Sequence, residues 1–162
     1  MKPAAYRSLC EPLLKTWLAN HIGLEPRHHG IDLVGKVSAM ELKTHDTFWK
    51  KNGWAFNKKE CTRYYQNHKG KDMWFAAMQY AIAKRPSAMR TQYQIARNLR
   101  ERETWLIPWE FILEIEPSQE TKDPWLYINK KKFQQKYAFI THMKTEWGDI
   151  YIPKDYAHEK IG

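Results

Sequence analysis

Residues 30–45 read Gly-Ile-Asp-Leu-Val-Gly-Lys-Val-Ser-Ala-Met-Glu-Leu-Lys-Thr-His. Two runs rich in β-branched and apolar residues, 31–34 and 37–44, flank the Gly35-Lys36 pair, which is typical of a tight turn. The pattern therefore predicts a β-hairpin of two short strands. The polar residues of this hairpin are the candidates for a function.

Successive side chains of a strand point to opposite faces of the sheet. Glu41 and Lys43 therefore share one face, while Met40 and Leu42 on the other face are available to a hydrophobic core. The return of the hairpin brings Asp32 alongside this strand. Two carboxylates and one ammonium group are thus expected to converge on a single spot among small or apolar neighbours.

Paired carboxylates suit a hard divalent cation such as Mg²⁺, which prefers oxygen ligands and keeps several waters. We expect Asp32 and Glu41 to bind Mg²⁺, with the backbone carbonyl of Leu42 as a further ligand and Mn²⁺ able to substitute. Such a cation polarises a phosphodiester and helps to ionise a bound water. Lys43 would orient that water and neutralise the charge that grows on the phosphorane. Asp32, Glu41 and Lys43 are the candidate catalytic residues.

Net charge points to a polyanionic partner. Lys and Arg number 27 against 18 Asp and Glu, a net charge of +9, and a cationic surface attracts nucleic acid. A stretch that mixes cations, amides and aromatic rings follows the hairpin directly. The candidate DNA-binding residues there are Lys50, Lys51, Asn52, Trp54, Asn57, Lys58 and Arg63. A second basic stretch, from Lys84 to Arg102, fits a solvated helix face as well as a DNA-facing one.

The 162 residues are most simply one domain, with an α/β or α+β fold in which helices flank a mixed central sheet. A helix is expected over 4–20, inside a helical N-terminal region 1–26, and the core spans 30–157. Further strands are expected over 73–82, 105–115 and 149–152 and helical character over 87–102. Residues 45–60 read as irregular, and 124–140 fit either helix or strand.

Several functional classes are excluded by what the sequence lacks. No apolar run approaches the roughly 20 residues of a membrane span, and the N-terminus has no apolar signal core. Two cysteines cannot form a disulfide framework or a four-cysteine zinc site, and Cys61 has no neighbouring group to activate it as a nucleophile. No glycine-rich phosphate loop suggests use of ATP. We expect a reduced, cytoplasmic protein.

The order Asp32, Glu41, Leu42, Lys43 across an apolar hairpin resembles the core of the PD-(D/E)XK nucleases, although Asp32 follows Ile31 where many members have proline. Within that family the chain resembles the PvuII-like type II restriction endonucleases. Shared patterns recur at Phe56-Asn57, at residues 73–76, at 114–117 and at 152–156, with an unassigned insertion over 66–104. Tyr64 falls where those enzymes carry an active-site tyrosine, which makes it a candidate accessory residue.

The resemblance implies a restriction-endonuclease-like core and Mg²⁺-dependent, site-specific cleavage of double-stranded DNA. It also implies a homodimer that pairs through the N-terminal helical region, with each subunit cutting one strand. Two identical subunits match a short palindromic site. Two alternatives stay open: a homing, repair or junction-cutting nuclease of the same fold, and a DNA-binding module without catalysis whose acidic pair only supports structure.

Overall fold

The computed structural model describes residues 3–47, 53–82, 88–115, 125–159 and 161–162. Its strands are β1 (Glu25–Pro26), β2 (Leu33–Val34), β3 (Ser38–Asp46), β4 (Trp54–Asn57), β5 (Asp72–Ile82), β6 (Leu99–Pro108), β7 (Trp125–Ile128), β8 (Phe139–Thr145) and β9 (Gly148–Pro153). Its α-helices are α1 (Pro3–Ile22), α2 (Lys58–Asn67), α3 (Gln92–Asn98), α4 (Trp109–Glu114) and α5 (Lys130–Lys136), and a 3₁₀ turn covers Lys154–Tyr156.

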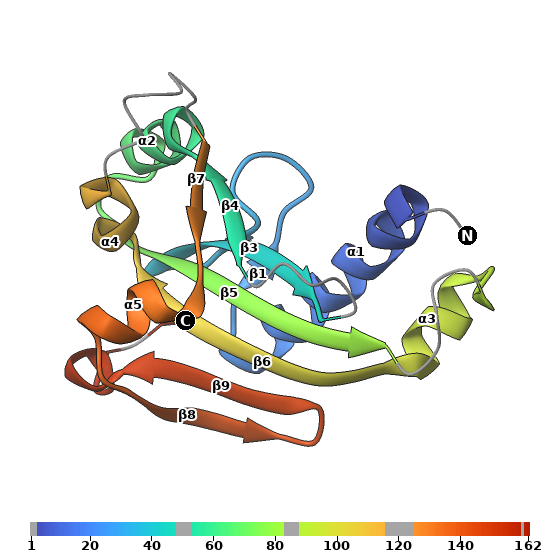
Figure 1. Ribbon diagram of the computed structural model, residues 1–162. Helices are drawn as coiled ribbons and strands as arrows, with labels where there is room; N and C mark the ends of the chain where they lie inside the picture. Colours follow the sequence, from blue (N-terminus) through green and yellow to red (C-terminus); the bar gives the residue numbers. More distant parts are fainter. Residues whose placement is uncertain (1–2, 48–52, 83–87, 116–124, 160) are drawn as a thin grey trace.

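A mixed seven-stranded sheet organises the fold, in the order β1-β2-β3-β5-β6-β9-β8 (Figure 1). β2 and β3 form the antiparallel hairpin that the sequence predicts, with Leu33 opposite Met40 and a turn closed by the Gly35 N–H donating to the Ser38 carbonyl. β3 then runs parallel to β5, so that Glu41 lies opposite Phe75. The long central strands β5 and β6 pair antiparallel.

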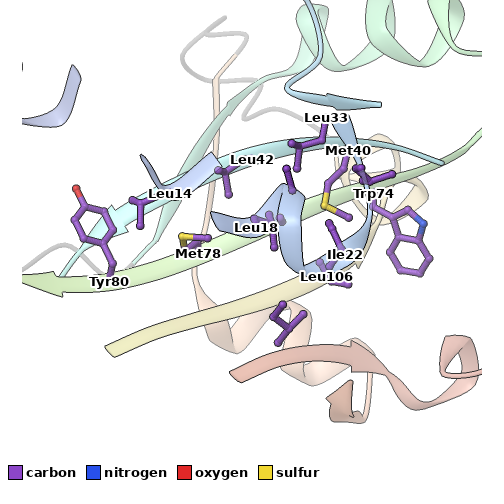
Figure 2. Close-up of a cluster of buried hydrophobic side chains, with 14 of the residues drawn as sticks. Leu14, Leu18, Ile22, Leu33, Met40, Leu42, Trp74, Met78, Tyr80 and Leu106 are labelled. Atoms are coloured by element: carbon purple, nitrogen blue, oxygen red, sulfur yellow. The ribbon is translucent and has the colours of Figure 1, made fainter. Parts of the chain in front are cut away.

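Helices α1 and α3 cover one face of the sheet. Leu14 and Leu18 of α1 are fully buried against Met40, Leu42 and Met78, as Figure 2 shows. Helical spacing places Leu14 and Leu18 on the same side of α1, which is the face that the periodicity of the sequence predicts. α1 therefore belongs to the main core and holds the back of β3 in place.

The opposite face of the sheet is covered by α2, α4, α5 and a separate two-stranded ribbon formed by β4 and β7. Aromatic rings dominate this second core. Phe75 of β5 stacks on Trp109 of α4 with ring centroids 4.1 Å apart, and Phe56 of β4 meets Phe75 edge-on at 4.4 Å. Such pairs add to the free energy of burial, so the face that carries Glu41 and Lys43 is as firmly packed as the back.

The predictions of the helix over 4–20, the strand over 73–82 and the strand over 149–152 are confirmed, as is the mixed sheet flanked by helices. The prediction of a strand over 105–115 is wrong beyond Pro108, where α4 begins. Residue 87 lies outside the described residues, and among 88–102 the α-helix covers only α3. The irregular reading of 45–60 is wrong where β4 and the start of α2 lie, while 48–52 fall outside the described residues. A short apolar run has no period that separates strand from helix, and β4 pairs with β7, which is far away in the sequence.

In the described part of the chain, no helix combines the length and the apolar character that crossing a membrane requires.

Replacing the buried Leu18 by alanine should lower the free energy of unfolding by about 2–5 kcal/mol, because the cavity would lie between α1 and the sheet. Urea denaturation followed by circular dichroism measures the change. Asn20→Ala, an exposed position on the same helix, is the control and should change little. Equal stability of Leu18→Ala and the wild type would show that α1 is not part of the cooperative core.

Candidate active site

The β2–β3 hairpin brings Asp32 to the edge of β3. The backbone N–H of Leu42 donates to Asp32 Oδ2 at 2.9 Å, and the Arg27 N–H donates to the Asp32 carbonyl at 2.7 Å. Both ends of the aspartate are therefore tied to the fold, the side chain to β3 and the backbone to the preceding loop. The expected convergence of Asp32 with residues 41–43 is present in the structure.

Glu41 is a buried carboxyl group, with 4% of its surface exposed. Burial raises the pKa of Glu41 far above its ordinary value, and a hydrogen bond to Asp32 and the negative charge of Asp32 raise it further. The positive charge of Lys43 acts in the opposite direction and lowers the pKa of Glu41. Asp32 and Lys43 are thus close enough to Glu41 to influence its pKa.

Asp32, Glu41 and Lys43 line one cleft of about 880 Å³. Its other walls come from α1, from α2 and from the β4–β7 ribbon, which contributes Ala55 and Tyr127. The catalytic candidates therefore lie at a surface that a large ligand can reach, in spite of the burial of Glu41. Perturbed titrating groups gathered in a cleft are typical of functional sites.

The donor set of this cleft fits Mg²⁺ or Mn²⁺. Along a strand the N–H and C=O of one residue point to the same neighbour, so the carbonyl of Leu42 faces the same edge of β3 as the N–H that binds Asp32. Two carboxylates and one carbonyl are oxygen ligands, and Mg²⁺ completes its shell with water. Across the described residues no group of three or more His, Cys, Asp and Glu side chains that could hold a metal ion is found, so the candidate ligands here are two carboxylates and one backbone carbonyl.

Lys15 is a residue of this site that the sequence did not reveal. From α1, Lys15 Nζ lies 3.0 Å from Asp32 Oδ1 and donates to the Arg27 carbonyl at 2.7 Å. Glu11, one turn earlier on α1, lines the same cleft. The resemblance implied that the helix pairs subunits. The contact of Lys15 was missed because the periodicity of the helix does not show which of its polar residues faces Asp32.

Tyr64 lines the cleft from α2, as does Glu60 one turn before it. Partial burial raises the pKa of Tyr64 to about 12, with the negative charges of Glu41 and Glu60 as further causes. The neighbouring Cys61 is buried, and burial raises the pKa of its thiol to about 12. A thiol with so high a pKa is a poor nucleophile, in keeping with the expectation from the sequence.

Three of the candidate DNA-binding residues have structural roles. Trp54 is buried, and its indole N–H donates to the Met78 carbonyl at 3.1 Å. Asn57 caps α2 by accepting from the N–H groups of Lys59 and Glu60.

Lys58 Nζ donates to the carbonyls of Ile112, Leu113 and Ile115 at the end of α4. These contacts give Trp54, Asn57 and Lys58 structural roles, and their contact with DNA stays a prediction. Arg63 is exposed on α2, and Lys50, Lys51 and Asn52 lie outside the described residues.

The β4–β7 ribbon presents two exposed aromatic side chains that sequence analysis missed. Trp125 and Tyr127 are 54% and 48% exposed, and both project from the outer face of β7. Lys132 Nζ donates to the Tyr127 backbone carbonyl at 3.4 Å, which adds a cation next to β7. Residues 124–140 were ambiguous in sequence, although the alternation of Trp125, Leu126, Tyr127 and Ile128 is a weak strand signal.

Comparisons with protein-family models, with curated proteins and with solved structures find no significant match.

Glu41→Gln should raise the free energy of unfolding at neutral pH by about 1–3 kcal/mol. A poorly compensated buried polar group usually costs this much stability, and the substitution removes the ionisable carboxyl that carries the cost. The pKa of Glu41 is higher in the folded chain than its ordinary 4.5, so the wild type loses stability as the pH rises above about 4.5, whereas the amide does not ionise. Denaturant titrations at several pH values should show the two proteins converging at low pH and diverging toward pH 8.

Glu25→Gln, at an exposed position on β1, is the matched control and should follow the wild type throughout. A Glu41→Gln protein no more stable than the wild type at pH 8 would mean that Lys43 and its surroundings fully compensate the buried charge.

Proposed function

We propose that this protein is a Mg²⁺-dependent endonuclease that cleaves double-stranded DNA at a specific site, as the PD-(D/E)XK type II restriction endonucleases do. One observation carries the proposal: Asp32, Glu41 and Lys43 meet at the wall of one cleft, with Asp32 bound to the backbone between the other two. The hairpin and its parallel neighbour β5 would then form the catalytic part of a restriction-endonuclease-like core.

Each residue of the cleft has a defined role in this proposal. Asp32, Glu41 and the Leu42 carbonyl hold the cation, which supplies Lewis-acid activation of the phosphate and of a water molecule. Lys43 orients the attacking water and offsets negative charge as the new phosphorus–oxygen bond forms and the bond to one sugar oxygen breaks. Tyr64, at the edge of the same cleft, is an accessory that contacts the phosphate.

The DNA surface in this proposal runs along the side of the molecule that bears the β4–β7 ribbon. Lys59 and Arg63 are exposed on α2, and Lys131 and Lys132 are exposed at the start of α5. These cations supply phosphate contacts, while Trp125 and Tyr127 supply apolar contacts to sugars and bases. Because Tyr127 also lines the cleft, this surface is continuous with the catalytic residues.

The complete enzyme in this proposal is a homodimer on a short palindrome, with one cleft for each strand. One cleft cuts one strand, and two-fold symmetry places a second cleft on the other strand. The buried face of α1 is used by the protein's own core, so pairing through the N-terminal region would use its exposed side.

Digestion of a sequenced plasmid by the purified protein tests the proposal directly. We expect discrete fragments in Mg²⁺, none in EDTA, and ends that map to one short palindrome. Cleavage at branched or long asymmetric sites would point to a repair or homing nuclease. An intact plasmid together with DNA binding would point to a module without catalysis.

Lys43→Ala should reduce the rate of cleavage by about 10²–10³-fold or more, since a cation that stabilises the transition state is removed. DNA binding should persist. Single-turnover cleavage and fluorescence anisotropy with a labelled duplex measure the two properties. Lys144→Ala, an exposed lysine on β8, should keep full activity. Unchanged cleavage by Lys43→Ala would remove the central residue of the proposed mechanism.

Tyr127→Ala should weaken duplex binding by about fivefold or more, equivalent to ~1 kcal/mol, through loss of an exposed contact beside the cleft. The measurement is made in a Lys43→Ala background so that the duplex stays intact. Tyr93→Ala removes an even more exposed ring, 68% exposed, from α3 on the other face of the sheet. The Tyr93→Ala control should bind the duplex as tightly as the Lys43→Ala protein. Equal losses of affinity in the Tyr127→Ala and Tyr93→Ala variants would argue against a DNA surface on the β4–β7 ribbon.

A further inference from the structure

Both carboxylate oxygens of Asp32 already have partners within the protein. Oδ2 accepts the Leu42 N–H at 2.9 Å, and Oδ1 lies 3.0 Å from Lys15 Nζ. The Leu42 hydrogen bond comes from the strand that carries Glu41 and fixes the carboxylate toward it. The Lys15 contact comes from a different element, α1, and places the positive charge of the ammonium group beside Oδ1.

A divalent cation bound at Oδ1 would compete with the Lys15 ammonium group for the negative charge of Asp32. Mg²⁺ binds carboxylate oxygen at about 2.0–2.1 Å, and an ammonium group at 3.0 Å from the same oxygen would face it with like charge at short range. Lysine has a flexible stem of four carbons and can move. Lys15 Nζ also has a second acceptor, the Arg27 carbonyl at 2.7 Å, which it can keep on leaving the carboxylate.

We infer that Lys15 competes with the divalent cation for Asp32, so that cation binding moves the Lys15 ammonium group off the carboxylate and leaves it in the cleft. This inference rests on the proposed function, since it takes Asp32 to be a cation ligand. In the cleft, Lys15 lies among residues that a phosphate would approach, with Lys43 on the neighbouring wall. Lys15 is thus a positioning residue that holds Asp32 until the cation replaces it.

A competing interpretation predicts the opposite change in cation affinity when the Lys15 side chain is removed. If Lys15 orients Asp32 for the cation, its removal should weaken cation binding, because the Arg27–Asp32 loop would lose its tie to α1. If Lys15 competes, its removal should strengthen cation binding. A single variant therefore separates the two roles, and the readout does not need DNA.

The experiment titrates Mn²⁺ alone into the protein and follows the free Mn²⁺ signal by electron paramagnetic resonance. Lys15→Met keeps the aliphatic stem and removes the charge. We expect it to bind Mn²⁺ about five- to tenfold more tightly than the wild type, the change that corresponds to loss of one ion-pair competitor. Lys15→Arg keeps the charge and should retain most of the competition.

Lys130→Met is the matched control. Lys130 forms a half-exposed ion pair with Glu103 at 3.0 Å, outside the cleft, and its loss should leave Mn²⁺ affinity unchanged. Thermal unfolding with and without Mn²⁺ gives a second readout, in which Lys15→Met should gain a larger stabilisation than the wild type at equal Mn²⁺.

Equal or weaker Mn²⁺ binding by Lys15→Met would overturn the inference and leave the nuclease proposal standing. Failure of the wild type and of Lys15→Met alike to bind Mn²⁺ would overturn the nuclease proposal itself. Lys15→Gln repeats the test with a polar side chain if Lys15→Met unfolds at the temperature of the titration.

Discussion

The hydrogen bond from the Leu42 N–H to Asp32 Oδ2 is the contact on which the candidate site depends. It joins the residue before β2 to the middle of β3, and in doing so it holds one carboxylate beside another that is buried. Without this bond the side chain of Asp32 would not be held beside Glu41. With it, two carboxylates, a backbone carbonyl and Lys43 share one edge of the sheet.

Such a site opposes the stability of the fold, because a buried carboxyl beside a second carboxylate resists ionisation, as the raised pKa of Glu41 indicates. The sheet can hold this arrangement because both of its faces are packed. α1 covers the back of β3, and an aromatic core covers the front next to the cleft. The rigidity needed to keep charged groups close together comes from apolar contacts that carry no chemistry of their own.

Several residues that look suited to DNA contact in the sequence also build the fold around the cleft. Asn57 ends β4 and caps α2, Lys58 binds the last carbonyls of α4, and Trp54 closes the core beneath the ribbon. An amide, an ammonium group and an indole serve equally well as internal hydrogen-bonding groups and as DNA contacts. The exposed rings of Trp125 and Tyr127 lie on β7 of the same ribbon, in a segment that is ambiguous in sequence.

The sequence by itself determined the β2–β3 hairpin, the faces to which Glu41, Lys43, Met40 and Leu42 point, and the helix that became α1, because all of these follow from local periodicity and turn chemistry. Only the tertiary structure decided that α4 ends the apolar run after Pro108, that β4 pairs with β7, and that Lys15 reaches Asp32. These features depend on contacts between residues far apart in the chain. No spacing within a single segment encodes such a contact, so only the folded arrangement shows it.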